Sequence, residues 1–318
     1  MRDQFGRTVN YMRISITDRC NLRCRYCMPE GIVPVAHRDI LTYEEILQAA
    51  GAAVELGVTK FKVTGGEPLV RLGCVDFLAR LKALPGVEAV TLTTNGVLLA
   101  PEVPRLAELG IDGVNVSLDA VDRETFAAIT GFDRLDRVTE GIDALLAAGI
   151  PAKVNCVLLP DSLARLVPLA RLAEQKIDVR FIEVMPIGAG DAQAGPSWEQ
   201  ALAVLRREWP DLSPVEERRG SGPARYYASE TLQGRIGSIA ALSHKFCDGC
   251  NRIRLTSTGR LKPCLCYGEG ADLRTVLRKR PDDLLPALRN AIWEKPAAHC
   301  FGQAGGVTEQ LVMGQIGG

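Results

Sequence analysis

Several classes of function are excluded by what this chain lacks. Its 38 Lys and Arg residues are balanced by 38 Asp and Glu residues, so no overall field directs it to nucleic acid or to a membrane surface. The N-terminus has no apolar segment of the kind found in secretion signals. No uninterrupted apolar run reaches the roughly 18 residues that a spanning helix needs. We therefore expect a cytoplasmic protein that binds neither nucleic acid nor membrane.

Histidine is also scarce, and the common nucleotide-binding loops are missing. The only histidines are His37, His244 and His299, and none lies in a motif, which disfavours a catalytic triad or a zinc hydrolase. His244 precedes Cys247 closely and remains an alternative metal ligand. Neither G-x4-G-K-[ST] nor G-x-G-x-x-G occurs. Any polyanionic substrate must therefore be held by a local basic cluster.

The first part of the chain alternates strand-like and helix-like segments. With 318 residues and 47% hydrophobic content, the chain is long enough for one large domain or two smaller ones. The predicted strands are 11–17, 58–63, 88–93, 112–118, 151–158 and 178–184. The predicted helices are 42–57, 74–84, 101–110, 122–130, 134–149 and 161–176. Repeated strand–helix units imply a parallel sheet, and six of them favour a partial (β/α) barrel over a doubly wound sheet.

The positions of special residues support the barrel. Cys20, Gly66, Thr93, Ser117 and Met185 all fall at or just after predicted strand ends, and in barrels that rim carries the chemistry. We therefore predict an α/β fold, with a partial (β/α)6 TIM-type barrel over residues 1–195. An α+β extension follows over residues 196–318, because the stretch 186–197 breaks the repeat. The last residues, 314–318, are expected to be flexible by composition.

Ten cysteines in a long chain without a signal peptide indicate metal binding rather than disulfides. Cys20, Cys24 and Cys27 are spaced C-x3-C-x2-C after the first predicted strand. Iron–sulfur clusters are normally held by four cysteines, so three would leave one iron open to a small molecule. Unrelated thiols, or a zinc site with a distant ligand, are the alternatives. Tyr26 before the third cysteine and the turn Gly65-Gly66-Glu67-Pro68 favour the cluster.

These motifs resemble those of the radical S-adenosylmethionine (SAM) superfamily. The resemblance implies a [4Fe-4S] cluster that passes an electron to the SAM sulfonium, giving methionine and a 5′-deoxyadenosyl radical. It also implies that Tyr26, Gly66, Ser117 and Met185 contact SAM. A side chain at position 66 would keep the backbone from the cofactor. The alternative roles are closure of a strand for Ser117 and packing in the core for Met185.

A second cysteine group lies near the C-terminus. Cys247 and Cys250 are followed by Cys264 and, two positions further, by Cys266. The spacing fits a structural zinc site or a second iron–sulfur cluster. Between them, Arg252 and Arg254 occupy alternate positions of a short predicted strand and should point the same way. Guanidinium groups suit phosphate or carboxylate because they offer planar bidentate donors.

Within the superfamily, the chain resembles the family of GTP-cyclising enzymes of molybdenum cofactor biosynthesis. The resemblance is carried by segments 13–20, 64–69, 92–96, 115–120 and 180–185, the second cysteine group and the final Gly317-Gly318. It implies that Cys247, Cys250 and Cys264 hold a second [4Fe-4S] cluster whose open iron binds guanine. The radical would abstract the C3′ hydrogen of GTP, and C3′ would then attack C8. The expected product is (8S)-3′,8-cyclo-7,8-dihydroguanosine 5′-triphosphate. Its formation is the first committed step of the pathway.

The same resemblance assigns GTP-binding residues. They are Arg13, Lys62, Thr93, Lys153, Arg252, Ile253 through its backbone, and Arg254. Arg13, Arg252 and Arg254 are also candidates for assisting cyclisation. Lys62 stands where we expect arginine, which keeps the charge but loses bidentate geometry.

The remaining cysteines and the tail carry weaker expectations. Cys266 is expected to be a bystander of the second cluster, while Cys300 has no assigned role. Cys74 and Cys156 are expected to be buried apolar residues. Gly317-Gly318 either reaches the GTP cavity, as in the family, or forms a disordered end.

The expected partners are GTP as substrate, a reductant protein for the cluster and a downstream enzyme that forms cyclic pyranopterin. A monomer or a homodimer is expected. The alternatives are a radical SAM enzyme that modifies a peptide with the help of an auxiliary cluster, and an iron–sulfur electron carrier.

Overall fold

The computed structural model describes residues 1–31, 35–188, 194–301 and 306–317. The chain divides into two compact units. Unit 1 comprises Met1–Asn21, Glu30–Thr93 and Cys247–Gly318, and unit 2 comprises Leu22–Pro29 and Thr94–Phe246. Each unit carries half of the predicted parallel strands together with strands from the later part of the chain.

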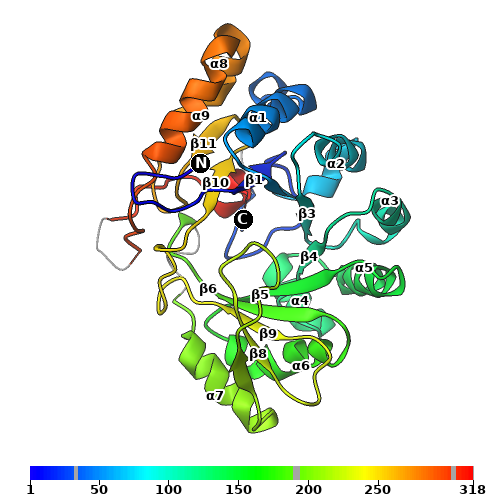
Figure 1. The fold of residues 1–318 in the computed structure, drawn as a ribbon. Coiled ribbons are helices and arrows are strands. Elements are labelled where there is room, and N and C mark those ends of the chain that lie inside the picture. The colour runs from blue at the N-terminus through cyan, green and yellow to red at the C-terminus, as the bar shows by residue number, and fades with distance from the viewer. Residues whose placement is uncertain (32–34, 189–193, 302–305, 318) are drawn as a thin grey trace. The chain divides into compact units, whose positions relative to one another are not determined.

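The sheet of unit 1 combines strands from the N-terminal and C-terminal regions of the chain. Its order is β12-β11-β10-β1-β2-β3, where β1 (Tyr11–Ser15), β2 (Lys60–Thr64) and β3 (Ala89–Thr94) are parallel. From the C-terminal region come β10 (Arg252–Leu255), β11 (Arg260–Lys262) and β12 (Ala271–Asp272). β10 runs parallel to β1, so a late yellow strand lies beside the blue first strand (Figure 1).

Helices cover this sheet. They are η1 (His37–Asp39), α1 (Tyr43–Glu55), η2 (Pro68–Val70), α2 (Cys74–Lys82), α8 (Leu273–Lys279), η7 (Pro281–Asp283), α9 (Leu284–Trp293) and α10 (Met313–Ile316). The capping box expected from Thr42 and Glu45 is present at the start of α1. Helices α8 and α9 both contact α1, so the C-terminal region also adds to the helical layer of unit 1 (Figure 1).

Unit 2 has a sheet of the same kind. Its order is β4-β5-β6-β9-β8-β7. The strands are β4 (Val114–Ser117), β5 (Ala152–Leu158), β6 (Asp178–Glu183), β7 (Ser213–Val215), β8 (Arg225–Ala228) and β9 (Ile236–Ile239). β4, β5, β6 and β9 are parallel, while β8 and β7 are antiparallel. The helices are η3 (Ala100–Glu102), α3 (Val103–Glu108), α4 (Arg123–Thr130), α5 (Leu135–Ala147), η4 (Ser162–Arg165), α6 (Leu166–Ala170), η5 (Arg171–Glu174) and α7 (Trp198–Glu208).

All six predicted strands are present, and their winding matches the predicted class. Within each unit the first strands follow one another in sequence order, β1-β2-β3 and β4-β5-β6. A doubly wound sheet would instead reverse its order at a switch point. The predicted α/β fold of the barrel type is therefore confirmed. The division into residues 1–195 and 196–318 stays a prediction.

Two predictions about local structure are wrong. The helix expected over 161–176 is broken into η4, α6 and η5, because Pro168 lacks an N–H and is tolerated only near a helix start. The tail expected to be flexible instead forms α10, with Ile316 1% exposed. Gly318 lies outside the described residues.

One buried carboxylate connects the end of β6 to the elements around it. Glu183 is 4% exposed and accepts hydrogen bonds from the backbone N–H groups of Trp198 at 3.1 Å, Leu242 at 2.8 Å and Ser243 at 3.0 Å. The N–H of Trp198, a residue that is 3% exposed, would otherwise be buried without a partner, which is costly. Glu183 therefore fixes the chain where Met185 follows β6. In the described part of the chain, no helix has the length and apolarity to cross a membrane.

Candidate active site

The first cysteine loop follows β1. Cys20 belongs to unit 1, and Cys24 and Cys27 belong to unit 2; all three are half-buried. The backbone N–H groups of Cys27 and Met28 donate to the Cys24 carbonyl at 2.9 and 3.0 Å, which shapes the loop as a tight turn. Partly accessible thiols in a loop fit a cluster that must also reach a small molecule.

Among the described residues, no three His, Cys, Asp or Glu side chains are grouped to bind a single metal ion. A [4Fe-4S] cluster makes a different demand, because each of its cysteines binds its own iron atom. The cysteines of a cluster site therefore need not converge on one point.

Tyr26 is held by a buried carboxylate. Its hydroxyl donates to Asp119 Oδ2 at 2.8 Å, and Asp119 Oδ1 accepts from the Val157 N–H at 2.8 Å. Burial, and then the nearby charge of Asp119, raises the pKa of Tyr26 well above its usual value. The phenol is thus a donor at ordinary pH. Asp119 lies in a motif that the sequence singled out, but its role as the residue that positions Tyr26 was missed.

The packing of the turn after β2 accounts for glycine at position 66 without any bound ligand. A Cβ at Gly66 would collide with the carbonyl oxygen of Arg19, while the Gly66 and Glu67 N–H groups donate to the Thr17 and Arg19 carbonyls at 2.7 and 2.8 Å. Close approach of two backbone segments therefore requires glycine here. Contact of Gly66 with SAM stays a prediction.

Most of the predicted GTP-binding residues share one face of the unit 1 sheet. Arg13 pairs in register with Lys62 on one side and with Arg254 on the other, and Tyr11 pairs with Arg252. Directly paired residues point to the same face, as do residues two apart. Arg252 and Arg254 therefore point the same way, as predicted.

Two further predicted residues occupy different places in this sheet. Ile253, on β10, is fully buried and points to the opposite face, so that only its backbone suits a ligand on the arginine face. Thr93 lies at the end of β3 and is half-buried, alternating with the buried Leu92 and Thr94.

The arginine face has a strong local field. Burial, followed by the charges of Arg13 and Arg252, lowers the pKa of Arg254 well below its usual value. Because a guanidinium does not lose its proton in proteins, this face stays cationic and favours an anionic ligand. The tail lies on the same face, where Arg254 Nη1 donates to the Gly317 carbonyl at 2.8 Å.

The second cysteine group is also in unit 1. Cys247, Cys250 and Cys264 are free and half-buried. Burial alone would raise the pKa of Cys250, but the charges of Arg252 and Lys295 outweigh it and lower that pKa to about 7. Burial raises the pKa of Cys264. A thiol that ionises near neutral pH beside cations fits metal ligation.

Arg7 supports this group from the N-terminal segment, and sequence reasoning missed it. Its guanidinium donates to the carbonyls of Cys247 at 2.9 Å, Ala297 at 2.7 Å and Pro296 at 2.7 Å, and it pairs with Asp3 at 2.6 Å. No motif marks such a residue, because its partners are backbone carbonyls far along the chain.

Cysteines outside the two triples are buried. Cys74 and Cys156 are 4% and 0% exposed, as predicted. Cys266 is fully buried, whereas Cys264 is half-buried, and Cys266 Sγ lies 3.3 Å from Cys300 Sγ. The weaker candidate ligand His244 pairs instead with Glu199 in unit 2 at 3.3 Å.

Unit 2 contributes a separate polar face. In the registers Asn115–Lys153, Ser117–Asn155 and Asn155–Arg180, these side chains lie on one face of β4, β5 and β6. Lys153 Nζ is bound to Asp178 Oδ2 at 2.9 Å, and Arg219 Nε contacts the same oxygen at 3.0 Å. The predicted phosphate-binding lysine is thus already neutralised by a carboxylate.

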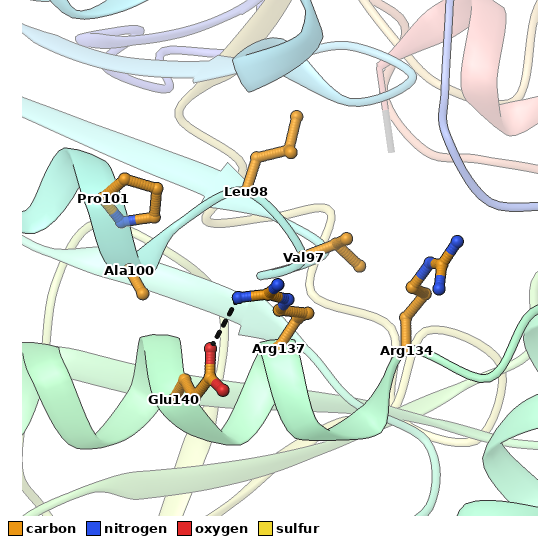
Figure 2. Close-up of a pocket in the computed structure, with 7 residues that line it drawn as sticks. All are labelled: Val97, Leu98, Ala100, Pro101, Arg134, Arg137 and Glu140. Carbon is orange, nitrogen blue, oxygen red and sulfur yellow. Dashed lines mark hydrogen bonds and ion pairs between the residues drawn. The ribbon is translucent and has the colours of Figure 1, made fainter.

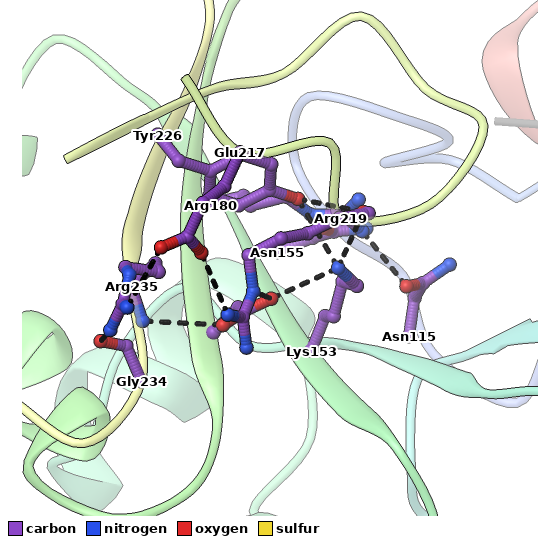
Figure 3. A network of polar contacts seen from close by, with 10 residues as sticks. Asn115, Lys153, Asn155, Arg180, Glu217, Arg219, Tyr226, Gly234 and Arg235 are labelled. Carbon is purple, nitrogen blue, oxygen red and sulfur yellow. Dashed lines mark hydrogen bonds and ion pairs between the residues drawn. The ribbon is translucent and has the colours of Figure 1, made fainter. Parts of the chain in front are cut away.

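Arg180 is a further basic residue on this face that sequence reasoning did not assign. It is 7% exposed and donates to the side-chain oxygens of Asn155 and Asn115, both at 2.9 Å (Figure 3). Within the described ranges it has amide partners and no carboxylate partner. A buried charge is costly unless it is paired, so this arrangement favours an anionic ligand. Its signal in the sequence was a cation between the apolar residues Val179 and Phe181 of a predicted strand.

One surface pocket of unit 2 is separate from these residues. It lies between the loop after β3 and the start of α5, and Arg137 pairs with Glu140 at its edge (Figure 2). None of the predicted site residues lines it.

Comparison with known proteins defines the class. Residues 14–173 match the Radical SAM superfamily, and residues 177–301 match the family described as Molybdenum Cofactor Synthesis C. Streptococcus suis SuiB bound to S-adenosylmethionine has a TM-score of 0.67 at 15% identity, covering 90% of this chain and 68% of that one. Native anSMEcpe with bound AdoMet has a TM-score of 0.62 at 17% identity, covering 92% and 82%. The fold is that of a radical SAM protein, a class that implies a [4Fe-4S] cluster and SAM.

Full-length relatives identify the family. The curated GTP 3′,8-cyclase of Heliobacterium modesticaldum is 44% identical over 330 residues, covering 100% of both chains. That of Geobacter sulfurreducens is 44% identical over 328 residues and 99% of both, and that of Clostridium perfringens is 39% identical over 323 residues and 100% of both. The chain belongs to the GTP 3′,8-cyclase family.

Proposed function

We propose that this chain converts GTP to (8S)-3′,8-cyclo-7,8-dihydroguanosine 5′-triphosphate, the first committed step of molybdenum cofactor biosynthesis. Membership of the family supports the reaction. The observation that carries it in this structure is the arginine face of unit 1, where Arg13 and Arg254 are paired in register and Arg252 points to the same face. Such a face suits a triphosphate, which offers several oxygens to planar donors.

The first cluster and SAM would be held by the cysteine loop and its neighbours. Cys20, Cys24 and Cys27 would bind the cluster, and Tyr26, Gly66, Ser117 and Met185 would contact SAM. When bound, this cluster supplies the electron that cleaves the carbon–sulfur bond of SAM. The contribution of the chain is positional, since Asp119 fixes Tyr26 and Glu183 fixes the segment that carries Met185.

A second [4Fe-4S] cluster would be held by Cys247, Cys250 and Cys264, leaving one iron without a protein ligand for the guanine base. Arg252 Nη2 lies 3.8 Å from Cys250 Sγ, so the same guanidinium is available both to the cluster sulfur and to a nucleotide. Arg13, Arg252 and Arg254 would orient GTP for attack of C3′ on C8, which is a matter of position rather than of acid–base chemistry.

The remaining GTP contacts are proposed for residues of both units. In unit 1 they are Lys62, Thr93 and the backbone of Ile253. In unit 2 Lys153 is proposed, with Arg180 and Arg219 added from the structure. Because Lys153 and Arg219 share Asp178, an incoming phosphate would meet two cations held side by side on one carboxylate.

The test is anaerobic incubation of the reduced, cluster-loaded protein with SAM and GTP deuterated at C3′. We expect 5′-deoxyadenosine to form only when GTP is present and to carry the deuterium. Formation stimulated by a peptide instead of GTP would favour the peptide-modifying alternative. Iron content shows whether the second site holds a cluster, because two clusters give about eight iron atoms per chain and one gives about four.

We also propose the coarser properties expected for such an enzyme. They are a cytoplasmic location, a protein that reduces the cluster, a downstream enzyme that forms cyclic pyranopterin, and a monomeric or homodimeric state. Gel filtration combined with light scattering decides the last of these.

A further inference from the structure

Two buried cysteines have no part in the proposed reaction. Cys266 and Cys300 are 0% and 8% exposed, and their sulfur atoms lie 3.3 Å apart. A disulfide has a sulfur–sulfur bond of about 2.05 Å, so bond formation requires a further approach of roughly 1 Å. The geometry is that of two thiols already facing each other.

The surroundings connect this pair to the second cysteine group. The Cys300 N–H donates to Cys266 Sγ at 3.4 Å, and the preceding N–H, that of His299, donates to Cys247 Sγ at 3.4 Å. Cys300 Sγ in turn donates to the Gly306 carbonyl at 2.5 Å. One short segment thus contacts both the thiol pair and a proposed cluster ligand. Hydrogen bonds to ligand sulfurs set the reduction potential of a cluster.

We propose that Cys266 and Cys300 form a reversible oxidation site that reacts with small hydroperoxides to give a disulfide. In the first step the Cys300 sulfur attacks hydrogen peroxide, the O–O bond breaks, and a sulfenic acid and water are formed. In the second step the Cys266 sulfur attacks that sulfenic sulfur, the S–S bond forms, and a second water leaves. The two thiols together lose two electrons and two protons, and the peroxide is reduced to two waters.

The order of the two steps follows from exposure. Cys300 retains some accessible surface, whereas Cys266 has none, so Cys300 meets the oxidant first. The same burial excludes bulky disulfide reagents. The product would join the segment containing His299 to the chain beside Cys264, and a dithiol reductant would reverse it.

The test is mass mapping of the full chain with its clusters bound. The protein is treated anaerobically with an equimolar amount of hydrogen peroxide, the free thiols are alkylated in denaturant, and the chain is digested without reduction. We expect a cross-linked peptide pair two hydrogens lighter than the separate peptides, with fragment ions that place the link at Cys266 and not at Cys264. Dithiothreitol should restore both thiols.

Controls keep the result specific. Cys266→Ala and Cys300→Ala should each abolish the cross-link, whereas Cys156→Ala, which alters another buried cysteine, should leave it unchanged. The cluster-free chain is mapped in parallel, so that thiols released from a damaged cluster are recognised. The proposal is overturned if both thiols remain alkylatable in the wild-type chain, or if Cys300 links to Cys247, Cys250 or Cys264. No GTP or SAM is present, so the outcome is independent of the proposed reaction.

Discussion

At the scale of single residues, the supporting contacts are made by residues to which the sequence assigned no role. Arg7 binds three backbone carbonyls around the second cysteine group, and Asp119 binds the hydroxyl of Tyr26. In both cases the partner is distant in sequence. A linear pattern identifies the residue that performs chemistry more readily than the one that holds it in place.

Replacement of Arg7 tests this support. Arg7→Ala leaves the Asp3 carboxylate, whose side chain is 0% exposed, without its ion-pair partner, and we expect a loss of about 3–5 kcal/mol in the free energy of unfolding. The second cysteine group should also lose iron faster to a chelator than the first. Arg2→Ala removes an exposed arginine nearby and serves as the control. Equal iron retention in the two variants would contradict the role of Arg7.

The buried carboxyl group of Asp119 should make the free energy of unfolding depend on pH. Burial raises its pKa above the usual value of 3.8, so the folded state disfavours the ionised form. Its contribution to stability is complete below pH 3.8 and is lost as the pH rises through the raised pKa. Asp119→Asn should remove this component. Urea unfolding of the cluster-free chain across the acidic range measures it, and identical pH profiles for variant and wild type would refute the assignment.

At the scale of elements, helices and strands can be predicted from the local pattern of apolar and polar residues, and a break in them can be traced to a single residue. The six strands and the cap at Thr42 are confirmed because alternation and capping chemistry are local. The broken helix at 161–176 was visible in Pro168. Neither the placement of β10 beside β1 nor the pairing of Arg13 with Arg254 was accessible, since strand register depends on contacts across the whole chain.

Glu183 allows an element-level prediction. Glu183→Gln places an amide N–H₂ among groups that all donate, so one or more of these donors lose their acceptor. We expect a loss of about 1–3 kcal/mol in the free energy of unfolding, with the start of α7 most affected in amide hydrogen exchange. Glu174→Gln, at the exposed end of η5, should change stability by no more than about 0.5 kcal/mol. Unchanged exchange protection at α7 would contradict this role of the carboxylate.

At the scale of the whole molecule, the C-terminal tail packs on the arginine face of unit 1, where Arg254 donates to the Gly317 carbonyl. Gly317 has a φ of +88°, and a Cβ there would lie 2.8 Å from Ser15 Cβ. Composition alone indicated flexibility, because glycine is as common in mobile ends as in positions that demand a left-handed backbone.

Gly317→Ala should displace the tail from Arg254. We expect weaker GTP binding and slower cyclisation with unchanged SAM binding, measured by equilibrium dialysis with each ligand. Gly51→Ala is the matched control, since it lies in α1 with no atom within 4 Å of the added Cβ. It should be neutral, or should stabilise by about 0.5–1 kcal/mol. GTP affinity equal to that of wild type in Gly317→Ala would show that the tail does not contribute.

The pairing of β1 with β10 also has a consequence for biosynthesis. Synthesis proceeds from the N-terminus, so every residue of unit 2 has been made before Cys247–Gly318 exists. The first strand emerges early, but one of its two hydrogen-bonding neighbours is translated in the last portion of the message. Premature termination after Phe246 but before β10 begins at Arg252 would therefore yield a chain with unit 2 complete and the opening strand left with an unsatisfied edge, which makes such truncated products natural substrates for chaperones.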